Sequence, residues 1–361
     1  MTLNWIELSR DALLHNITAI KGKAKGRKIL AVVKSNAYGH GLVEVSSILK
    51  DHVHGFIVAD LEEGLELREV LSNVKIILSL PPLNKKEIIE AAHNNFSIFA
   101  GNLQYITQLS KISLPKPIYV HLEINTGMNR SGLSPQDLSK AINIIYQSPH
   151  LKLEGIFSHY ATLPDDMDFA KRQAESFQKV LSEVKLPENI LVHMENSLGI
   201  LKLPLEITNS IRPGIALYGL VSIDSDTHLD PVLSLRSQVI DVISIRKGEG
   251  VSYDHLFKAN DDMWVATIPS GYGNGYMWNL KGKAEVLLHG KRLPVLGKIC
   301  MNHIMFDVTK LVGEVKIGDT VTLIGKDGKE EITVSELAES SNTINYEIVT
   351  KLSPKLKRVI V

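Results

Sequence analysis

Six polar side chains follow apolar runs of the sequence, and their types could carry acid–base and anion-binding chemistry: Lys34, Tyr38, Arg130, His159, Ser197 and Arg212. A lone lysine is most often a solvated surface charge, a lone histidine a core residue and a lone serine a helix cap. Lys34, however, ends residues 29–33, an apolar and β-branched run typical of a strand buried on both faces. Because ligands bind at the C-terminal ends of parallel strands, we expect the six side chains to converge at one site.

Short apolar runs alternate with amphipathic helical segments through the first two-thirds of the chain. We count eight runs, at residues 29–33, 55–59, 75–80, 96–100, 118–124, 153–159, 190–195 and 207–212. This alternation predicts an α/β fold with an N-terminal (β/α)8 barrel of the TIM type. The last two runs are the weakest, so an open, doubly wound sheet is the alternative.

After Tyr218 the sequence no longer shows clear helical periodicity between its apolar runs. A loop rich in Asp and Ser leads into strand-like runs that are separated by glycine turns such as KGEG, HGK and KDGK. We therefore predict a barrel over residues 1–224 and a C-terminal, mostly-β domain over residues 225–361.

Composition and charge narrow the class of protein. The chain has 361 residues, 44% of them hydrophobic, and its 40 Lys and Arg residues balance 40 Asp and Glu residues. No basic patch indicates nucleic acid or a membrane surface as a partner. The single cysteine, Cys300, agrees with a reducing compartment, and no segment resembles a signal peptide or membrane span. We expect a cytoplasmic protein.

The segment SIRPGIALYG adds an anion-binding feature. Gly214 follows Pro213 at a turn that could open a helix, where free N–H groups and the helix dipole favour an anion. This signal is weak alone, because such turns are common. Together with a lysine placed to form an imine, it suggests an aldehyde cofactor that carries a phosphate, and pyridoxal 5′-phosphate (PLP) is the obvious one.

At this point the sequence closely resembles the alanine racemase family over essentially its whole length. The motifs that carry the resemblance occur in the family's order: AVVKSNAYGHG, EINTGMNRSG, FSHYA, ENS, SIRPGIALYG, VSYDHLF, IPSGYGNGY, GKICMNH and INYE. The resemblance implies a PLP enzyme with an N-terminal barrel and a C-terminal β-domain that reaches the active site of the other subunit of a homodimer.

The resemblance also implies roles for barrel residues. Lys34 would hold PLP and then act as one acid–base group, while Arg212 would face the pyridine nitrogen with His159 beside the ring. The phosphate would be held by Tyr38, Ser197, Gly214, Ile215 and Tyr346. A guanidinium only donates hydrogen bonds and stays charged, so it disfavours a protonated pyridine nitrogen and favours return of the proton to the α-carbon over transamination.

Inversion of a stereocentre needs a proton-transfer group on each face of the planar intermediate. The family's second base corresponds to Tyr253, reached from the other subunit. Without the resemblance, Tyr253 would be read as an ordinary β-domain tyrosine. By the same resemblance, Arg130 would lie near the substrate carboxylate, the Met301 N–H would bind that carboxylate from the partner chain, and Tyr272 would line the entrance.

Three positions depart from the family's pattern. Glu123 stands where the family often has a carbamylated lysine that fixes the arginine of TGMNR, so Arg130 could pair with Glu123 directly or through water. Asn302 replaces the aspartate of the family's CMD motif, and Asn274 lies in GNG where the family has ADG. These changes bear on substrate preference and rate.

The sequence therefore predicts a PLP-dependent amino acid racemase, active as a homodimer, that interconverts L- and D-alanine and supplies D-alanine for peptidoglycan. Two alternatives remain among enzymes: a racemase preferring serine or another small amino acid, and a decarboxylase on the same fold. A PLP-binding protein without strong catalysis is a third, and the β-domain and Tyr253 argue against it because such proteins resemble the barrel alone.

Overall fold

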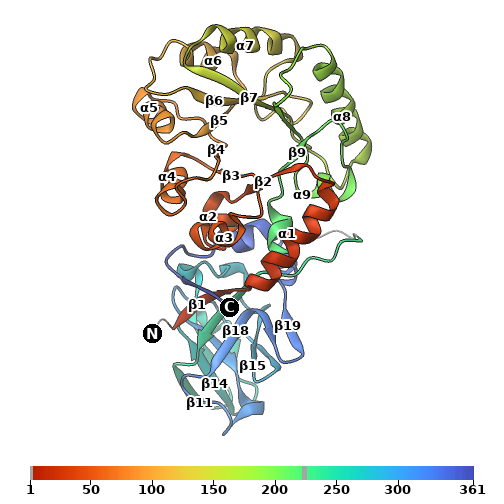
Figure 1. The fold of residues 1–361 in the computed structure, drawn as a ribbon. Helices are drawn as coiled ribbons and strands as arrows, with labels where there is room; N and C mark the ends of the chain where they lie inside the picture. The colour runs from red at the N-terminus through yellow and green to blue at the C-terminus, as the bar shows by residue number, and fades with distance from the viewer. Residues whose placement is uncertain (1–2, 222–225) are drawn as a thin grey trace.

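A closed barrel of parallel strands forms the larger part of the molecule (Figure 1). The computed structural model describes residues 3–221 and 226–361. The barrel strands are β2 (Lys28–Val32), β3 (Gly55–Val58), β4 (Ile76–Leu78), β5 (Ser97–Ala100), β6 (Ile118–Glu123), β7 (Leu151–Phe157), β8 (Leu191–His193) and β9 (Ser210–Ile211). Pairing of β9 with β2 closes the ring. The predicted (β/α)8 barrel is confirmed, and the open sheet is excluded. β8 and β9 are short, which explains their weak sequence signal.

Helices surround the barrel and connect its strands (Figure 1). They are α1 (Arg10–Ala24), α2 (Lys34–Tyr38), α3 (Leu42–Leu49), α4 (Leu61–Val70), α5 (Lys85–His93), α6 (Leu103–Leu109), α7 (Pro135–Gln147), α8 (Met167–Ser182), α9 (Ser197–Lys202) and the 3-10 turn η1 (Ile215–Tyr218). Short polar side chains start several of them. Asp60, Asn84, Asn102 and Asn196 each accept a hydrogen bond from the backbone N–H three residues later.

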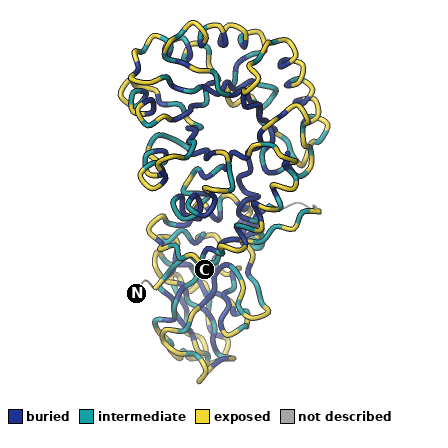
Figure 2. The backbone as a smooth tube through the Cα atoms, in the orientation of Figure 1, coloured by how far each residue is buried: buried dark blue, intermediate teal, exposed yellow. Residues whose placement is uncertain are grey.

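The inside of the barrel is half apolar and half polar. Leu30, Ile57 and Ile77 form one small cluster within it. Opposite them, the rings of His121 and His193 are fully buried, and the strands that line the barrel are dark over most of their length in Figure 2. Charged groups and imidazole rings inside the barrel need hydrogen-bonding partners, because a buried polar group without one destabilises the folded protein.

The second part of the molecule consists mainly of β-strands, as predicted, and most of these strands pair antiparallel. A seven-stranded sheet has the order β16-β15-β18-β10-β1-β20, with β19 paired to β18; β11-β14-β17 and β12-β13 form two smaller sheets. The strands are β1 (Asn4–Leu8), β10 (Leu233–Gln238), β11 (Asp241–Ile245), β12 (Gly250–Val251), β13 (Phe257–Lys258), β14 (Met263–Ile268), β15 (Glu285–Leu288), β16 (Lys291–Pro294), β17 (Ile304–Asp307), β18 (Thr320–Asp327), β19 (Glu330–Ile332) and β20 (Lys357–Ile360). Two helices, α10 (Val334–Ser341) and α11 (Asn345–Thr350), and the 3-10 turns η2 (Tyr253–His255), η3 (Tyr272–Asn274), η4 (Trp278–Leu280) and η5 (Thr309–Leu311) complete it.

The N-terminal strand β1 requires a correction to the predicted domain limits. The predicted limits place residues 4–8 in the barrel, but these residues pair antiparallel with β10 and parallel with β20. Both edges of β2 are already occupied by β3 and β9, so the barrel has no place for another strand. Figure 1 shows β1 in the lower part of the molecule, in the same sheet as β18 and outside the barrel. The predicted boundary between residues 224 and 225 lies outside the described residues.

Membrane-spanning helices and metal-binding clusters are two further features to consider in residues 3–221 and 226–361. No helix among them has the length and apolarity needed to cross a membrane. Nor does any group of three or more His, Cys, Asp or Glu side chains in this part of the chain have an arrangement that could hold a metal ion.

Candidate active site

A cavity of about 1010 Å³ opens at the C-terminal ends of the barrel strands. Nine of the predicted site residues line it: Lys34, Tyr38, Arg130, His159, Ser197, Arg212, Gly214, Ile215 and Tyr346. Tyr346 belongs to α11 of the second part of the chain, and its ring centroid lies 5.8 Å from that of Tyr38. The side chains that follow five different barrel strands in the sequence therefore share one space.

Lys34 is followed by an unusual backbone turn. Ser35, Asn36, Ala37 and Tyr38 all have φ values between 52° and 55°, the left-handed region that non-glycine residues rarely occupy. Glu63 holds this turn, because its carboxylate accepts hydrogen bonds from the N–H groups of Asn36 and Ala59, each at 2.8 Å. The turn places both Lys34 and Tyr38 on the cavity wall.

The environment of Lys34 favours its neutral amine. Burial is the largest cause that lowers the pKa of Lys34, and the positive charge of Arg130 lowers it further. Glu63 opposes this shift, and Arg212 adds a smaller lowering effect. A neutral amine can attack a carbonyl or accept a proton, whereas an ammonium group can do neither. The site thus provides Lys34 with the two properties that an imine-forming base needs.

Ser197, Gly214 and Tyr38 form an oxygen- and N–H-rich corner of the cavity. The Ser197 Oγ accepts hydrogen bonds from the N–H groups of Gly214 (2.9 Å) and Ala216 (3.1 Å). A Cβ atom on Gly214 would lie 2.6 Å from the Tyr38 hydroxyl. The absence of a side chain at Gly214 therefore leaves room for the Tyr38 hydroxyl at the start of η1, and the corner suits a phosphate group.

Arg212 is buried at the mouth of the barrel, and its guanidinium donates several hydrogen bonds. Its Nη2 donates to the carbonyl oxygens of Ser158 (2.7 Å) and Met194 (3.1 Å) and to His159 Nδ1 (3.0 Å), and its Nη1 donates to His193 Nδ1. Burial lowers the pKa of Arg212 to about 10, so the guanidinium remains charged at neutral pH. It can only donate to a ligand, as the sequence predicted for a partner of a pyridine nitrogen.

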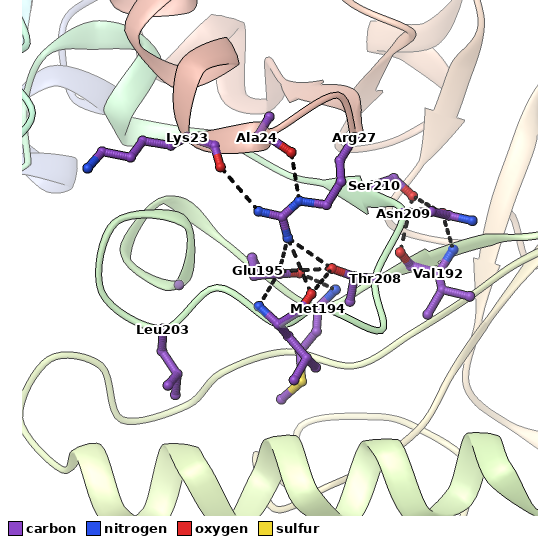
Figure 3. Close-up of polar contacts among 12 residues, drawn as sticks. Lys23, Ala24, Arg27, Val192, Met194, Glu195, Leu203, Thr208, Asn209 and Ser210 are labelled. Atoms are coloured by element: carbon purple, nitrogen blue, oxygen red, sulfur yellow. Dashed lines mark hydrogen bonds and ion pairs between the residues drawn. The ribbon is translucent and has the colours of Figure 1, made fainter.

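A buried acid fixes the segment that carries Ser197 and Arg212. Glu195, which has no exposed surface, accepts hydrogen bonds from Thr208 Oγ1 (2.9 Å) and the Leu205 N–H (2.9 Å), and it pairs with Arg27 (2.5 Å), as Figure 3 shows for Arg27 and Thr208. Its own carbonyl oxygen accepts from the Arg212 N–H at 2.9 Å. Because the acid is fully paired, it ties α1, β8 and β9 together beneath the site.

Arg130 and Glu123 lie close enough to interact electrostatically. The Arg130 Nη2 lies 4.0 Å from Glu123 Oε1, and the other carboxylate oxygen accepts from Ser131 Oγ at 2.5 Å. The Arg130 side chain is half exposed toward the cavity, and Glu123 is buried beside it. This separation allows an electrostatic interaction but is too long for a direct hydrogen bond, so both direct pairing and pairing through water fit the geometry.

Tyr253, Tyr272 and Met301 do not join the cavity of their own chain. They are exposed by 67%, 44% and 57%. Tyr272 and Met301 lie in adjoining loops, since the Gly273 N–H donates to the Met301 carbonyl oxygen at 2.8 Å. Ser252, next to Tyr253, donates to the Lys298 carbonyl oxygen at 2.7 Å. The three therefore occupy connected loops on the surface of the β-rich part.

Two of the positions that depart from the family's pattern lie in the same loops. The Asn302 Nδ2 donates to Asn274 Oδ1 at 3.5 Å. Asp254 pairs with Lys298, and this hydrogen bond lowers the pKa of Asp254. The loops that carry Tyr253, Tyr272 and Met301 thus contain a neutral amide pair and a balanced ion pair.

Three supporting residues were missed by sequence reasoning: Glu63, His193 and Glu195. Glu63 lies in the first turn of α4, where acids are common on any helix. His193 and Glu195 lie in or beside a run that predicts β8, and the pattern does not distinguish them from other strand residues. Their roles depend on pairing between distant strands, which periodicity does not encode.

A closed (β/α)8 barrel with a partly buried lysine, a corner suited to an anion and a buried arginine at its C-terminal mouth is typical of enzymes of the imine-forming barrel class. Family models for "Alanine racemase, N-terminal domain" and "Alanine racemase, C-terminal domain" match residues 8–222 and 232–360. The chain therefore belongs to the alanine racemase family, whose members are PLP-dependent.

Individual relatives agree over nearly full length. An alanine racemase of Limosilactobacillus fermentum is 37% identical over 349 residues, which cover 93% of this chain and 91% of that protein. The crystal structure of alanine racemase from Bacillus anthracis with bound L-Ala-P has a TM-score of 0.92 at 32% identity, covering 100% and 95% of the two chains. A histidine racemase from Leuconostoc mesenteroides has a TM-score of 0.92 at 29% identity, covering 99% and 98%.

Proposed function

We propose that this protein interconverts L- and D-alanine with PLP as its cofactor. The observation that carries the proposal is the placement of Lys34, whose pKa is lowered by burial, in one cavity with Arg212 and the Ser197–Gly214 corner. Alanine is the substrate named for the Limosilactobacillus fermentum relative. In a bacterial cytoplasm, the product would serve as a source of D-alanine for peptidoglycan.

The residues present suit PLP. The corner made by Tyr38, Ser197, Gly214, Ile215 and Tyr346 would hold the phosphate by hydroxyls and backbone N–H groups, in space that a Cβ at Gly214 would close. Arg212 offers only donors to the ring nitrogen. When bound, PLP withdraws electrons from the substrate's α-carbon and so acidifies the α-proton.

Two groups of this protein move the α-proton in our proposal. Lys34 Nζ takes it from, or returns it to, one face of the α-carbon. The Tyr253 hydroxyl of a second copy serves the opposite face, because one side chain cannot reach both. Arg130 orients the substrate carboxylate, with the Met301 N–H beside it and Tyr272 at the entrance. The exposure of Tyr253, Tyr272 and Met301 in their own chain supports their use across a homodimer.

The histidine racemase relative supports a second candidate, a racemase of another amino acid. One assay separates the candidates: the purified full chain with PLP is incubated with L-alanine, L-serine and L-histidine separately, and the enantiomers are resolved by chiral chromatography. We expect D-alanine to form fastest, and Lys34→Ala to abolish it. Faster formation of D-serine or D-histidine would replace alanine as the substrate, and racemisation of none of them would refute the proposed function.

A further inference from the structure

A column of hydrogen-bonded side chains runs from Arg212 down the inside of the barrel. Arg212 Nη1 contacts His193 Nδ1, His193 Nε2 lies 2.9 Å from His121 Nδ1, and His121 Nε2 lies 3.0 Å from Glu154 Oε2. Glu154 in turn accepts from Ser97 Oγ at 2.5 Å and pairs with Lys75. Since Lys75 immediately precedes β4 and Arg212 immediately follows β9, the column joins the two ends of the barrel.

The backbone is adapted to this column at two positions. Between Val120 and His121 the pairing of β6 with β7 skips Glu154, so a bulge turns the Glu154 side chain toward His121. The next residue is Gly155, where a Cβ atom would lie only 2.2 Å from His121 Nδ1. A bulge and a glycine side by side are what the chain needs to place a glutamate and an imidazole in the centre of the barrel.

The hydrogen bonds have a single possible direction. A guanidinium has donors only, so His193 Nδ1 must accept and the His193 proton must reside on Nε2. That proton is donated to His121 Nδ1, which leaves the His121 proton on Nε2, where it is donated to Glu154. Burial lowers the pKa of both histidines, in agreement with two neutral rings. Every donor therefore points away from Arg212, and the column ends on a carboxylate.

The acid at the end of the column is held ionised. Although burial opposes ionisation, hydrogen bonds from His121, Lys75 and Ser97 lower the pKa of Glu154 to about 2. Among the described residues, the hydrogen bonds of the Arg212 side chain go to neutral groups, namely the rings of His159 and His193 and the carbonyl oxygens of Ser158 and Met194. Glu154 is thus an anion to which the guanidinium is connected through a path of hydrogen-bonded side chains.

We propose that Glu154 is a positioning residue for Arg212: by accepting the last hydrogen bond, it fixes the tautomers of His121 and His193 and so the orientation of the guanidinium at the opposite end of the barrel. Its effect on catalysis rests on the proposed function, since Arg212 acts on the cofactor ring only if PLP binds there. Its effect on the two imidazoles does not, and each effect has its own measurement.

The first measurement uses the wild-type chain labelled with 15N-histidine. We expect NMR to show both His121 and His193 as neutral rings protonated at Nε2, with their N–H protons shifted far downfield and protected from exchange. Rings that are charged, or protonated at Nδ1, would overturn the proposal. This arm needs neither racemase activity nor a variant, so it stands even if the chain fails to racemise any amino acid.

The second measurement compares Glu154→Gln with Ser97→Ala, which removes a hydrogen bond from the same carboxylate but leaves its charge and the column. In Glu154→Gln we expect both imidazole N–H resonances to move upfield and kcat for alanine to fall about tenfold, as for loss of comparable supporting hydrogen bonds elsewhere, with KM unchanged. In Ser97→Ala we expect both resonances and kcat to be retained. Equal losses of kcat in the two variants, or an unmoved His193 resonance in Glu154→Gln, would show that Glu154 only stabilises the lower end of the barrel.

Discussion

The carboxylate of Glu63 accepts a hydrogen bond from the backbone N–H of Asn36 at 2.8 Å and thereby holds the turn that follows Lys34. Its second oxygen accepts from the Ala59 N–H, so both oxygens are used. Four consecutive residues in the left-handed region are unfavourable on their own, and they persist because surrounding contacts fix them. Glu63 is one of those contacts, although it does not line the cavity wall itself.

Replacement of Glu63 should therefore weaken the site more than it weakens the fold. In Glu63→Gln, the amide offers one oxygen to the two backbone N–H groups of Asn36 and Ala59, so one of them faces the amide N–H₂ group and loses its acceptor. An unpaired buried donor of this kind destabilises the turn by about 1–3 kcal/mol. We expect a lower affinity for PLP, measured by titration of the cofactor-free chain followed by absorbance. Glu62→Gln, at an exposed position of the same helix turn, is the matched control. Equal PLP affinity in the two variants would contradict the role of Glu63.

A second prediction concerns Gly214. Its replacement by Ala places a methyl group 2.6 Å from the Tyr38 hydroxyl, so either the ring or η1 must shift. A strained contact of this kind costs about 1–3 kcal/mol. We expect weaker binding of PLP and of free phosphate, measured by calorimetry. Gly22→Ala serves as the control, because no atom lies within 4 Å of the added methyl group. Unchanged phosphate affinity in Gly214→Ala would argue against an anion site at this corner.

The sequence predicts the barrel well and its interior poorly. Parallel strands buried on both faces read as continuous apolar runs, and the polar residue after each run marks the mouth, which is how Lys34 and Arg212 can be found. His121 and Glu154 lie inside such runs, and only the three-dimensional register shows that they face one another. β1 was misplaced for a related reason: a five-residue strand does not reveal that its partners lie more than 200 residues away.

The reactivity of Lys34 should depend on pH in a way that Arg130 controls. Burial and Arg130 lower the pKa of Lys34, so in the cofactor-free chain its amine should become reactive at a lower pH than an exposed lysine does. Arg130→Leu removes the second cause, and the pKa of Lys34 should rise. Competitive acetylation across pH, read by mass spectrometry, gives the midpoint. Arg172→Leu, on the exposed face of α8, should leave it in place. A midpoint that stays or falls in Arg130→Leu would reject this electrostatic account.

Acid should destabilise the protein through His40. This ring has no exposed surface, its Nδ1 lies 3.0 Å from the Tyr38 carbonyl oxygen, and burial lowers its pKa from 6.5 to about 4. As pH falls, His40 is protonated in the unfolded chain before it is protonated in the folded protein. The contribution of the neutral ring to the free energy of unfolding is therefore complete above pH 6.5 and is lost as pH falls toward 4. The loss at pH 5 is about 2 kcal/mol.

Urea unfolding at pH 7.5 and pH 5 measures this contribution. We expect His40→Gln to reduce the difference in unfolding free energy between the two pH values, because glutamine does not titrate. His93→Gln, at an exposed position, should keep the wild-type difference. The same pH dependence in His40→Gln as in wild type would assign the acid sensitivity to other groups.

The final prediction tests whether Lys34 and Tyr253 share a site across two copies of the chain. Tyr253 is 67% exposed and outside its own cavity, which is why the proposed function assigns it to the cavity of a partner. Lys34→Ala and Tyr253→Ala homodimers should each be inactive. A mixed dimer contains one site with both lesions and one intact site. An equal mixture under exchange conditions should therefore recover about a quarter of wild-type activity, since half of the dimers are mixed and each has one intact site.

The control for this experiment mixes Lys34→Ala with Arg212→Ala. Both lesions affect a chain's own cavity, so neither site of that mixed dimer is intact and no activity should return. Tyr253→Phe alone should keep PLP absorbance, because Tyr253 is not among the residues that we propose to hold the cofactor, while exchange of the α-proton is lost far more from one enantiomer than from the other. Mass spectrometry under native conditions establishes that mixed dimers have formed. If they have formed and the Lys34→Ala and Tyr253→Ala mixture remains inactive, the two residues do not act on the same substrate molecule.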